Sequence, residues 1–260
     1  MVSYISLIKV EFKKVLSGPI NKFSLKTLTF LYIVHQNLKK DIFIKKRAIY
    51  YANVNVFETQ KSVNYLVKKY IEKFNYREED LKIRPGLKGI FKGLISLQYR
   101  DSAEYIELNE GLIPDMLFIR DIKLEYKKVL IIEKEAIIDT TGCNGRLLVS
   151  GKGFPCRNTL SFLKFITCKY KHIILESLTD LDPHGLLIHL KYIEEIPKIT
   201  RIGLSCEDLL KNGVDKHQCI PLTENDKNIL KKLIKDNFVK EEAKFIEGFG
   251  YKFELNQNLL

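Results

Sequence analysis

The sequence predicts an α/β protein with two domains, an N-terminal winged-helix domain (helical with a small hairpin) and a Rossmann-like domain with a parallel sheet. In the N-terminal third, apolar residues recur at the helical period. From Lys127 on, short apolar runs of strand length alternate with helical stretches, as in parallel sheets with crossover helices. A length of 260 residues is enough to bury two cores. We expect the domains to be 1–97 and 98–260.

The first helix is expected over Leu25–Leu38, with Ser24 as its N-cap. Before it, apolar and charged residues alternate over Ile8–Phe12 as in a strand, but a helix fits as well, so residues 1–24 are left unassigned. The residues that follow the helical period are Leu25, Leu28, Leu31 and Tyr32.

Two further helices and a hairpin complete the predicted N-terminal domain. A short helix is expected over Lys45–Ala52, and a longer one over Thr59–Phe74 with an apolar face and a lysine-rich face. Leu81–Arg84, a Pro-Gly turn and Lys88–Gly93 indicate a short hairpin. This order is typical of a winged helix, whose third helix can enter a major groove, although a solvated face explains the lysines equally well. The apolar face comprises Val63, Leu66, Val67, Tyr70, Ile71 and Phe74.

The second domain is expected to contain buried strands joined by helices. Residues 98–126 show no clear periodicity and are expected to bridge the two domains. Thr223–Leu260 is mostly helical and amphipathic, so we expect it to pack on the sheet domain. The strands are predicted at Val129–Glu133, Arg146–Ser150, His172–Leu178 and Ile199–Leu204, with helices at Asn158–Tyr170 and Gly185–Glu194.

The charge and the cysteines restrict the class of protein. A net charge of +11 and a pI of about 9.2 favour a polyanionic partner, nucleic acid first, although a lysine-rich composition explains part of the excess. The 5 cysteines are odd in number and form no C-x-x-C pair, which argues against a disulfide framework and a zinc site. The N-terminus is not a secretory signal, and no apolar run approaches the length of a membrane helix. We expect an intracellular protein without a membrane partner.

Acidic residues follow the predicted strands. Glu133 ends the first strand, and Asp180 and Asp182 follow the third on alternate positions of an extended segment, so their carboxylates point the same way. Ligands of open α/β sheets bind beyond the carboxyl ends of the strands. Three oxygen donors without a histidine or cysteine set favour Mg²⁺ over zinc. Solvated acids in a turn are the alternative, and Glu135, where a helix begins, competes less well than Glu133 for the first ligand position.

Two adjacent tyrosines follow a Lys-Lys-Arg cluster in Lys45–Phe57. If this stretch is helical, Arg47 lies one turn before both Tyr50 and Tyr51. A phenol is a poor nucleophile at neutral pH, and a nearby cation or a metal-bound anionic substrate favours attack by its oxygen. Helical geometry does not choose between the two tyrosines, and a core aromatic beside an exposed one is the simpler explanation.

A glycine-rich loop, Gly151–Pro155, follows the second predicted strand. Its glycines let backbone amides approach a phosphate, and Lys152 adds positive charge. The spacing and the Ser/Thr of a Walker A motif are missing. A plain glycine turn is an equally good interpretation.

The combination of these motifs resembles a known family. The order is that of the A subunit of DNA topoisomerase VI and of the meiotic protein that makes double-strand breaks to start recombination. The part with IIEKEA and D-x-D-P-x-G is similar to a Toprim domain, the metal-binding module of topoisomerases and primases. The resemblance covers roughly Leu25–Leu255 and rests on the motifs KRAIYYANVNVF, KGIFKG, VLIIEKEA, SGKGFP, LTDLDPHG, IGLSCEDL and PLTENDKNIL.

The resemblance implies a winged-helix domain with the catalytic tyrosine, followed by a Toprim domain. Tyr51 is the second aromatic of the family's R-x-x-[YF]-Y motif and so takes the place of the nucleophile, and Arg47 is the arginine of that motif. Family members act as homodimers in which the tyrosine of one protomer meets the metal site of the other. The Mg²⁺-ligand positions correspond to Glu133, Asp180 and Asp182, and the positions associated with DNA contact correspond to Lys88, Lys152 and Phe154.

The implied activity is that of a topoisomerase-like DNA transesterase, which makes double-strand breaks through a 5′-phosphotyrosyl link and initiates meiotic recombination. Its partners would be double-stranded DNA and an ATPase resembling the topoisomerase VI B subunit, because the sequence has no ATP motif of its own. Its place would be the nucleus in a eukaryote, and otherwise it would be intracellular and DNA-associated. The alternatives are a catalytic A subunit of a type IIB topoisomerase, a non-catalytic DNA-binding homologue, and a Toprim nuclease or primase.

The sequence departs from the family pattern at a few positions. Ala48 replaces the acidic residue usual after the arginine, and Cys156 and Leu160 stand where the family tends to have Asp and Arg. The stretch between Glu133 and Gly151 is shorter than usual. None of these changes removes the nucleophile or a predicted metal ligand.

Overall fold

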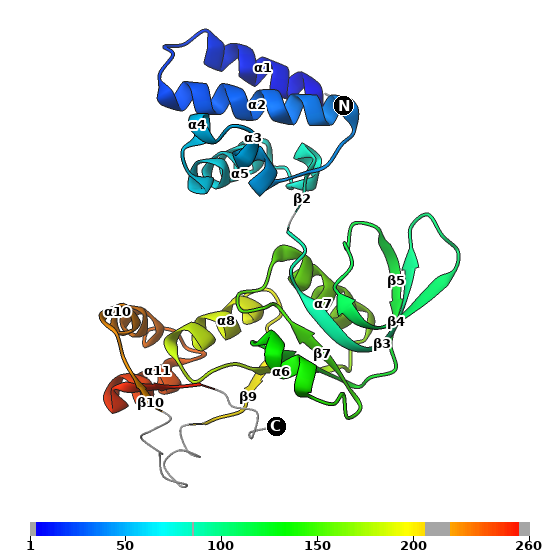
Figure 1. Ribbon diagram of the computed structural model, residues 1–260, viewed down its shortest axis with the longest axis vertical. Helices are drawn as coiled ribbons and strands as arrows, with labels where there is room; N and C mark the ends of the chain where they lie inside the picture. Colours follow the sequence, from blue (N-terminus) through cyan, green and yellow to red (C-terminus); the bar gives the residue numbers. More distant parts are fainter. Residues whose placement is uncertain (1–3, 85, 206–218, 255–260) are drawn as a thin grey trace. The chain divides into compact units, whose positions relative to one another are not determined.

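The computed structural model describes residues 4–84, 86–205 and 219–254. It divides into two compact units, Met1–Gly86 and Leu87–Leu260, each with its own core (Figure 1). The expected boundary between residues 97 and 98 falls inside a strand of the second unit, β3 (Ile90–Tyr99). The second unit therefore begins earlier in the chain than the sequence suggested.

The first unit is a bundle of helices around one apolar core. The unassigned N-terminal stretch forms a helix that lies along the next one. The two helices predicted over Lys45–Ala52 and Thr59–Phe74 are confirmed, and the apolar face of the longer one is buried. The elements are α1 (Tyr4–Leu16), α2 (Lys22–Lys40), β1 (Ile44–Lys45), α3 (Lys46–Ala52), α4 (Val54–Phe57), α5 (Gln60–Phe74), the 3-10 turn η1 (Glu79–Leu81) and β2 (Ile83–Arg84).

The cap of α2 differs from the prediction. Asn21 is the N-cap, and its side chain accepts a hydrogen bond from the backbone N–H of Ser24 at 2.9 Å. The hydroxyl of Ser24 in turn accepts a hydrogen bond from the Asn21 backbone N–H, so the two residues form a capping box. The prediction that Ser24 is the N-cap is wrong. Ser24 lies in the first turn of α2 and takes part in the capping box from that position.

The predicted wing hairpin is wrong. Strand β2 pairs in parallel with β1 inside the first unit, whereas Lys88–Gly93 runs into the start of β3, which belongs to the second unit and pairs with other strands there. The reason is that alternate side chains of β3 are buried along most of its length, so both of its edges find partners in a larger sheet. A short hairpin would account for the first residues of β3 only, because the buried alternation continues along most of the strand.

The second unit is built on a seven-stranded sheet. Its strands β4 (Tyr105–Leu112), β3, β7, β6, β8 and β9 are neighbours in that order, and β5 (Ile119–Lys123) also pairs with β3. Strands β7, β6, β8 and β9 run parallel, as the sequence predicted, whereas β3 is antiparallel to its neighbours. The parallel strands are β6 (Lys128–Ile132), β7 (Arg146–Ser150), β8 (Ile174–Leu178) and β9 (Thr200–Ile202).

Residues 98–126 do not bridge two domains, which corrects that expectation. They contain β4 (Tyr105–Leu112) and β5 (Ile119–Lys123), which pair with β3 at one side of the sheet. Most of β4 is exposed on both faces, so the segment lacks the alternation of apolar and polar residues that identifies a strand from sequence.

Helices cover both faces of the parallel strands (Figure 1). On one face, Val129 and Ile131 of β6 join a core with Phe162 and Ile166 of α7. On the other, the alternate residues of β6 pack with Ile137 of α6. These helices are α6 (Glu135–Thr140), α7 (Arg157–Lys169) and α8 (Pro183–Ile193).

A third apolar cluster joins the C-terminal segment to α8. Helices α10 (Glu224–Leu233) and α11 (Lys240–Phe249) pack on α8, as the amphipathic pattern predicted. Strand β11 (Tyr251–Phe253) pairs with β10 (Cys219–Pro221) and forms a bridge to Leu181. Residues 255–260 of the predicted helical tail lie outside the described part of the chain.

Candidate functional site

The tyrosine motif lies on α3 in the first unit. Ile49 is fully buried in the bundle core and anchors the helix, and Tyr50 packs against the same core. Tyr51 has 66% of its surface exposed, and its ring lies 5.4 Å from that of Tyr50, centroid to centroid. Arg47, one turn earlier, is also exposed. The simpler expectation of a core aromatic beside an exposed one therefore applies, and the exposed phenol is that of Tyr51.

The acidic residues gather at a reversal in strand order. From β6 the chain passes through α6 to β7 on one side, and from β7 it crosses through α7 to β8 on the other side of β6. The ends of β6 and β8 therefore border a topological switch point, the usual ligand position in open α/β sheets. Glu133 follows β6 directly, and Asp180 and Asp182 follow β8.

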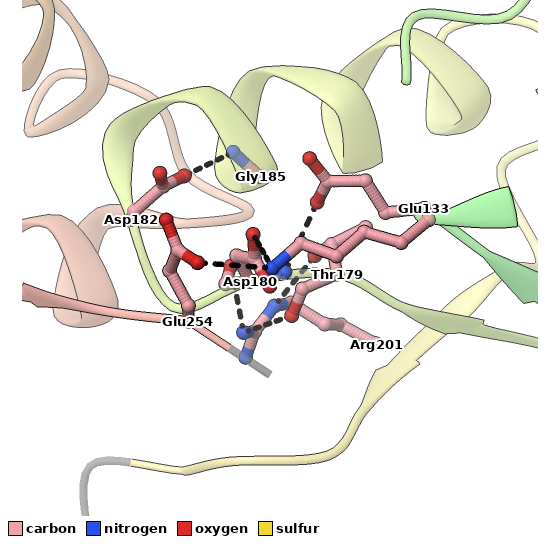
Figure 2. A network of polar contacts seen from close by, with 8 residues as sticks. Glu133, Thr179, Asp180, Asp182, Gly185, Arg201 and Glu254 are labelled. Atoms are coloured by element: carbon pink, nitrogen blue, oxygen red, sulfur yellow. Dashed lines mark hydrogen bonds and ion pairs between the residues drawn. The ribbon is translucent and has the colours of Figure 1, made fainter. Parts of the chain in front are cut away.

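Asp180 is the centre of this site (Figure 2). Its backbone N–H donates a hydrogen bond to Oε2 of Glu133 at 3.0 Å. Its own carboxylate Oδ2 lies 3.0 Å from the Nζ of Lys134. The Nη2 of Arg201 donates to its backbone carbonyl at 3.3 Å and to that of Thr179 at 3.0 Å. Glu133 and Asp180 are therefore joined directly.

Asp182 is turned toward the helix that follows it. It is the N-cap of α8, and its Oδ1 accepts a hydrogen bond from the backbone N–H of Gly185 at 2.5 Å. Figure 2 shows this carboxylate directed toward Gly185 in the first turn of α8. The backbone of Asp182 is still extended, and the expectation that Asp180 and Asp182 present both carboxylates to one side stays a prediction.

Burial and the charge of Asp180 make the carboxyl groups of Glu133 and Asp182 hard to ionise. Burial, followed by the charge of Asp180, raises the pKa of Glu133 to about 7. Burial also raises the pKa of Asp182, to which the charge of Asp180 contributes. The ion pair with Asp180 outweighs the burial of Lys134 and raises the pKa of its ammonium. Carboxylates that repel one another at a buried place are stabilised by any cation that joins them.

The donor set fits Mg²⁺ by chemistry. Glu133, Asp180 and Asp182 supply only oxygen donors, which a hard divalent cation prefers. Burial, the largest cause, raises the pKa values of Glu133 and Asp182, and a bound cation would favour their ionised forms. Among the described residues, no group of three acidic, histidine or cysteine side chains is already arranged to hold a metal. The site is therefore suited to a cation by composition and charge.

The glycine-rich loop lies against the acid site. The backbone N–H of Gly153 donates to the carbonyl of Glu133 at 3.0 Å, and the Ser150 hydroxyl donates to the same oxygen at 3.1 Å. Lys152 has a φ of 53°, and its Nζ pairs with Oε1 of Glu135 at 2.7 Å. The competing acid Glu135 is thus paired with a lysine of this loop, whereas Glu133 contacts Asp180.

The remaining predicted contact residues lie near this loop. Phe154 is exposed at its tip. Lys88 precedes Gly89, where a Cβ would lie 3.1 Å from the carbonyl of Ser150, so the backbone entering β3 passes close to the start of the loop. The structure thus brings Lys88, Lys152 and Phe154 to one region beside the acid site.

The departures from the family pattern occupy structural positions. Leu160 is buried on the inner face of α7 and belongs to the main core, so an arginine there would need a different packing. Cys156 is the N-cap of α7, and its Sγ lies 3.3 Å from the hydroxyl of Thr159. Hydrogen bonds from Thr159 and the Lys88–Gly89 backbone outweigh burial and lower the pKa of the Cys156 thiol. Ala48 is exposed on α3.

Sequence reasoning missed three residues of the acid site. Lys134 follows Glu133 directly and was passed over because it is not a metal ligand. Arg201 and Glu254 come from segments far along the chain, and no local pattern marks them. Glu254 lies 3.4 Å from the Nζ of Lys134 through its Oε2. The only available signal was the position of Arg201 inside a predicted strand that borders β8.

Comparisons with known proteins identify the family. The sequence profile described as "Type IIB DNA topoisomerase" matches residues 22–83, and the profile of the Toprim domain shared by Spo11 and the A subunit of topoisomerase 6 matches residues 128–257. A probable meiosis-specific SPO11 homologue of Encephalitozoon cuniculi is 31% identical over 231 residues, which cover 81% of this chain and 75% of that protein. The chain belongs to the family of Spo11 and the topoisomerase VI A subunit.

More distant members of the Spo11 family show the same relationship. Human meiotic recombination protein SPO11 is 27% identical over 92% of this chain and 65% of its own length. The A subunit of DNA topoisomerase 6 from Arabidopsis thaliana is 23% identical over 89% of this chain and 59% of its own length. The chain thus spans between about half and two thirds of the length of several curated relatives.

Membership of the Spo11 family confirms the expected architecture, an N-terminal helical region of the type IIB topoisomerases followed by a Toprim domain with a mostly parallel sheet. It also places the exposed Tyr51 within one profile match and all three predicted acids within the other. In the described part of the chain, no helix has a stretch long and apolar enough to cross a membrane.

Proposed function

We propose that this Spo11 family member is a DNA transesterase that makes double-strand breaks through a 5′-phosphotyrosyl link and in this way initiates meiotic recombination. The observation that carries the proposal is that one chain holds both parts of such a reaction. Tyr51 is an exposed phenol on a basic helix, and the half-buried Glu133 and the buried Asp180 form an acid pair suited to a cation. The relatives named as meiotic recombination proteins support the meiotic role.

In the reaction, the phenol oxygen of Tyr51 attacks a backbone phosphorus of double-stranded DNA. A bond forms between that oxygen and phosphorus, and the bond from phosphorus to the 3′ oxygen breaks. The phenol gives up its proton, and the leaving 3′ oxygen takes up a proton and becomes the free 3′ hydroxyl. One phosphodiester replaces another, so no ATP is consumed in this step. The exposed Arg47 lies one turn from Tyr51 and supplies positive charge for the phosphate oxygens.

The acid site serves the same phosphate. Glu133, Asp180 and Asp182 would hold Mg²⁺, which supplies positive charge that neutralises the phosphate. Lys88, Lys152 and Phe154, near the same loop, are proposed to contact the DNA. Two protomers, each contributing one tyrosine, would cut the two strands, and an ATPase resembling the topoisomerase VI B subunit is the proposed partner. The proposed location is the nucleus.

Covalent trapping tests this function. The protein is incubated with duplex DNA and Mg²⁺, with the partner ATPase present, and then denatured, and DNA attached to the protein is measured. The wild type and Tyr50→Phe should trap DNA, and Tyr51→Phe should not. Tyr32→Phe, which changes another exposed tyrosine of the same unit, is the matched control and should trap normally.

The outcome separates the alternatives. Trapping that survives Tyr51→Phe but is lost in Tyr50→Phe would move the nucleophile to Tyr50. Cleavage that leaves a free 5′ phosphate would indicate a Toprim nuclease instead. DNA binding without any trapping, unchanged by Glu133→Gln, would indicate a non-catalytic homologue. Relaxation of supercoiled DNA with resealed strands would favour the A subunit of a type IIB topoisomerase, as in the plant relatives.

A further inference from the structure

The acid site already contains a positive charge from its own chain. The Nζ of Lys134 lies 3.0 Å from Oδ2 of Asp180 and 3.4 Å from Oε2 of Glu254. Figure 2 shows Glu254 beside Asp180, with dashed lines from both carboxylates to the same nitrogen. Lys134 directly follows Glu133, whose own carboxylate accepts the backbone N–H of Asp180. An ammonium therefore occupies a position between two acids where a bound cation would also be attracted.

We propose that Lys134 is an internal counter-ion of this site, which lies between Asp180 and Glu254 when no metal is bound and shifts onto Glu254 alone when a divalent cation takes Asp180. This inference rests on the metal site of the proposed function, but not on the chemistry of the tyrosine. It makes Lys134 and Glu254 positioning residues that set how tightly the site binds metal.

The two partners of the first ion pair differ in their freedom to move. The side chain of Asp180 is 6% exposed and that of Lys134 is 33% exposed. The backbone of Asp180 is held on both sides, by Glu133 at its N–H and by Arg201 at its carbonyl. Lysine has a flexible stem with a single charged end. The ammonium can therefore leave while the carboxylate stays in place.

Glu254 is placed to receive the ammonium. It follows β11, and backbone hydrogen bonds of 3.0 and 3.1 Å join Phe253 to Leu181, the residue next to Asp180. The C-terminal segment is thus tied to the strand end that carries the acids. The side chain of Glu254 is largely exposed, so an ammonium paired there stays partly in water and loses little solvation.

The pairing has a consequence in each state of the site. Without metal, Lys134 compensates a buried carboxylate beside two other acids, and its loss leaves like charges uncompensated. With metal on Asp180, the ammonium and the divalent cation would repel one another at the same carboxylate. Lys134 therefore stabilises the metal-free protein and weakens metal binding.

Binding of Mn²⁺ to the full-length protein without DNA tests the proposal, with free Mn²⁺ followed by electron paramagnetic resonance. Lys134→Met keeps the length of the side chain but removes its charge, and it should tighten Mn²⁺ binding by about tenfold, the value of one hydrogen-bonded ion pair. Lys134→Arg keeps the charge and should bind like the wild type. Lys128→Met is the matched control, because Lys128 begins β6, the strand that leads to Glu133 and Lys134, and pairs with Glu176 at 3.4 Å, away from the acids.

Glu254→Gln tests the second half of the movement. In the wild-type background it removes the place to which the ammonium moves, so Mn²⁺ binding should weaken severalfold. In the Lys134→Met background there is no ammonium to move, and the same substitution should change Mn²⁺ binding little. Equal weakening in both backgrounds would make Glu254 a direct ligand and would overturn its proposed role.

Thermal unfolding distinguishes this role from that of an ordinary ion pair. Lys134→Met should lower the melting temperature in the presence of a chelator and should show a larger rise than the wild type when Mn²⁺ is added. An equal loss of stability with and without Mn²⁺, together with unchanged affinity, would overturn the proposal. Absence of Mn²⁺ binding in every variant would refute both the metal site and the inference. Tightened binding in Lys134→Met without any Tyr51-dependent trapping would refute the proposed function alone.

Discussion

At the scale of single residues, the acid site depends on a close contact behind Asp180. Gly185, in the first turn of α8, lies so near the Asp180 backbone that an added Cβ would be 2.3 Å from its carbonyl oxygen. The same glycine donates its N–H to Asp182. Gly185 therefore lets the helix begin directly against the segment that carries both aspartates.

Gly185→Ala should destabilise the protein by at least about 2 kcal/mol, because the atom in the way is backbone and cannot turn aside. Denaturant unfolding monitored by circular dichroism measures the change. It should also weaken Mn²⁺ binding, because Asp180 must shift.

Gly248→Ala is the matched control for Gly185→Ala. Gly248 is an exposed glycine within α11, and an added Cβ meets nothing within 4 Å. This substitution should leave the protein unchanged or stabilise it by about 0.5–1 kcal/mol through helix propensity. Similar effects of the two substitutions would contradict the assigned contact.

A buried histidine gives the second unit a dependence on pH. His189 of α8 is buried, and its Nδ1 lies 2.7 Å from the hydroxyl of Ser177 in β8. Burial, together with the nearby charge of Arg201, lowers the pKa of His189 from 6.5 to about 4. The unfolded chain therefore takes up a proton at this residue below pH 6.5, whereas the folded protein does so only near pH 4.

The contribution of His189 to stability should be fully present above pH 6.5 and should disappear as the pH falls to about 4, a total of about 3 kcal/mol. His189→Gln removes this titration, and groups that titrate elsewhere cancel in the comparison. The free energy of unfolding of the wild type relative to the variant should thus fall between these two pH values. Parallel pH profiles would contradict the prediction.

At the scale of elements, helix ends show which local signals are reliable. The N-cap of α2 is Asn21, whose side chain bonds to the first turn, whereas Asn53, the N-cap of α4, makes no side-chain cap hydrogen bond. Both are asparagines of the first unit and differ in this bond. The stabilisation that an N-cap residue gives therefore depends on the hydrogen bond that its side chain makes. The residue type alone does not predict that bond.

Asn21→Ala should destabilise the first unit by about 1 kcal/mol, because the N–H of Ser24 loses its partner. Asn53→Ala should cost clearly less, since no cap hydrogen bond is lost. Thermal unfolding of the full-length protein, followed by circular dichroism, measures both. A larger loss in Asn53→Ala would contradict this ranking.

The elements that the sequence predicted are those whose apolar residues recur at a clear helical or strand spacing. Strands β6 to β9 and helices α5, α7 and α8 form near their expected places because each buries a regular set of apolar residues. Strand β4 escaped prediction because its exposed residues follow no alternation. The wing was wrongly placed because a pairing across the sheet resembles a hairpin when only the first few residues of β3 are considered.

The candidate site likewise has features that the sequence predicted and features that it did not. Glu133 and Asp180 were predicted to meet because the ends of adjacent parallel strands must be close, and they are joined by a hydrogen bond. The role of Asp182 as the N-cap of α8 was not predicted, since it depends on where α8 begins. Glu254 could not be found at all, because only the pairing of β11 with Leu181 brings it near.

At the scale of the whole molecule, the tyrosine and the acids belong to different compact units. Tyr51 lies in Met1–Gly86, and Glu133 lies in Leu87–Leu260. Such a division allows the tyrosine of one protomer to work with the acids of another, as the resemblance to the family implies. We expect this chain to share its sites between protomers in that way, and a mixture of two inactive variants tests it.

A mixture of Tyr51→Phe and Glu133→Gln proteins should recover activity that neither has alone. In a dimer of one of each, the intact tyrosine comes from the Glu133→Gln protomer and the intact acids come from the Tyr51→Phe protomer, so one complete site exists only if the sites are shared. Random pairing makes half of the dimers mixed, each with one site of two, so covalent trapping should reach about a quarter of the wild-type level. The trapped products should be nicks in one strand, measured on denaturing and native gels, with DNA attached only to the Glu133→Gln protein. If the mixture traps no DNA although mixed dimers are shown to form, each tyrosine works with the acids of its own chain and the shared arrangement is wrong.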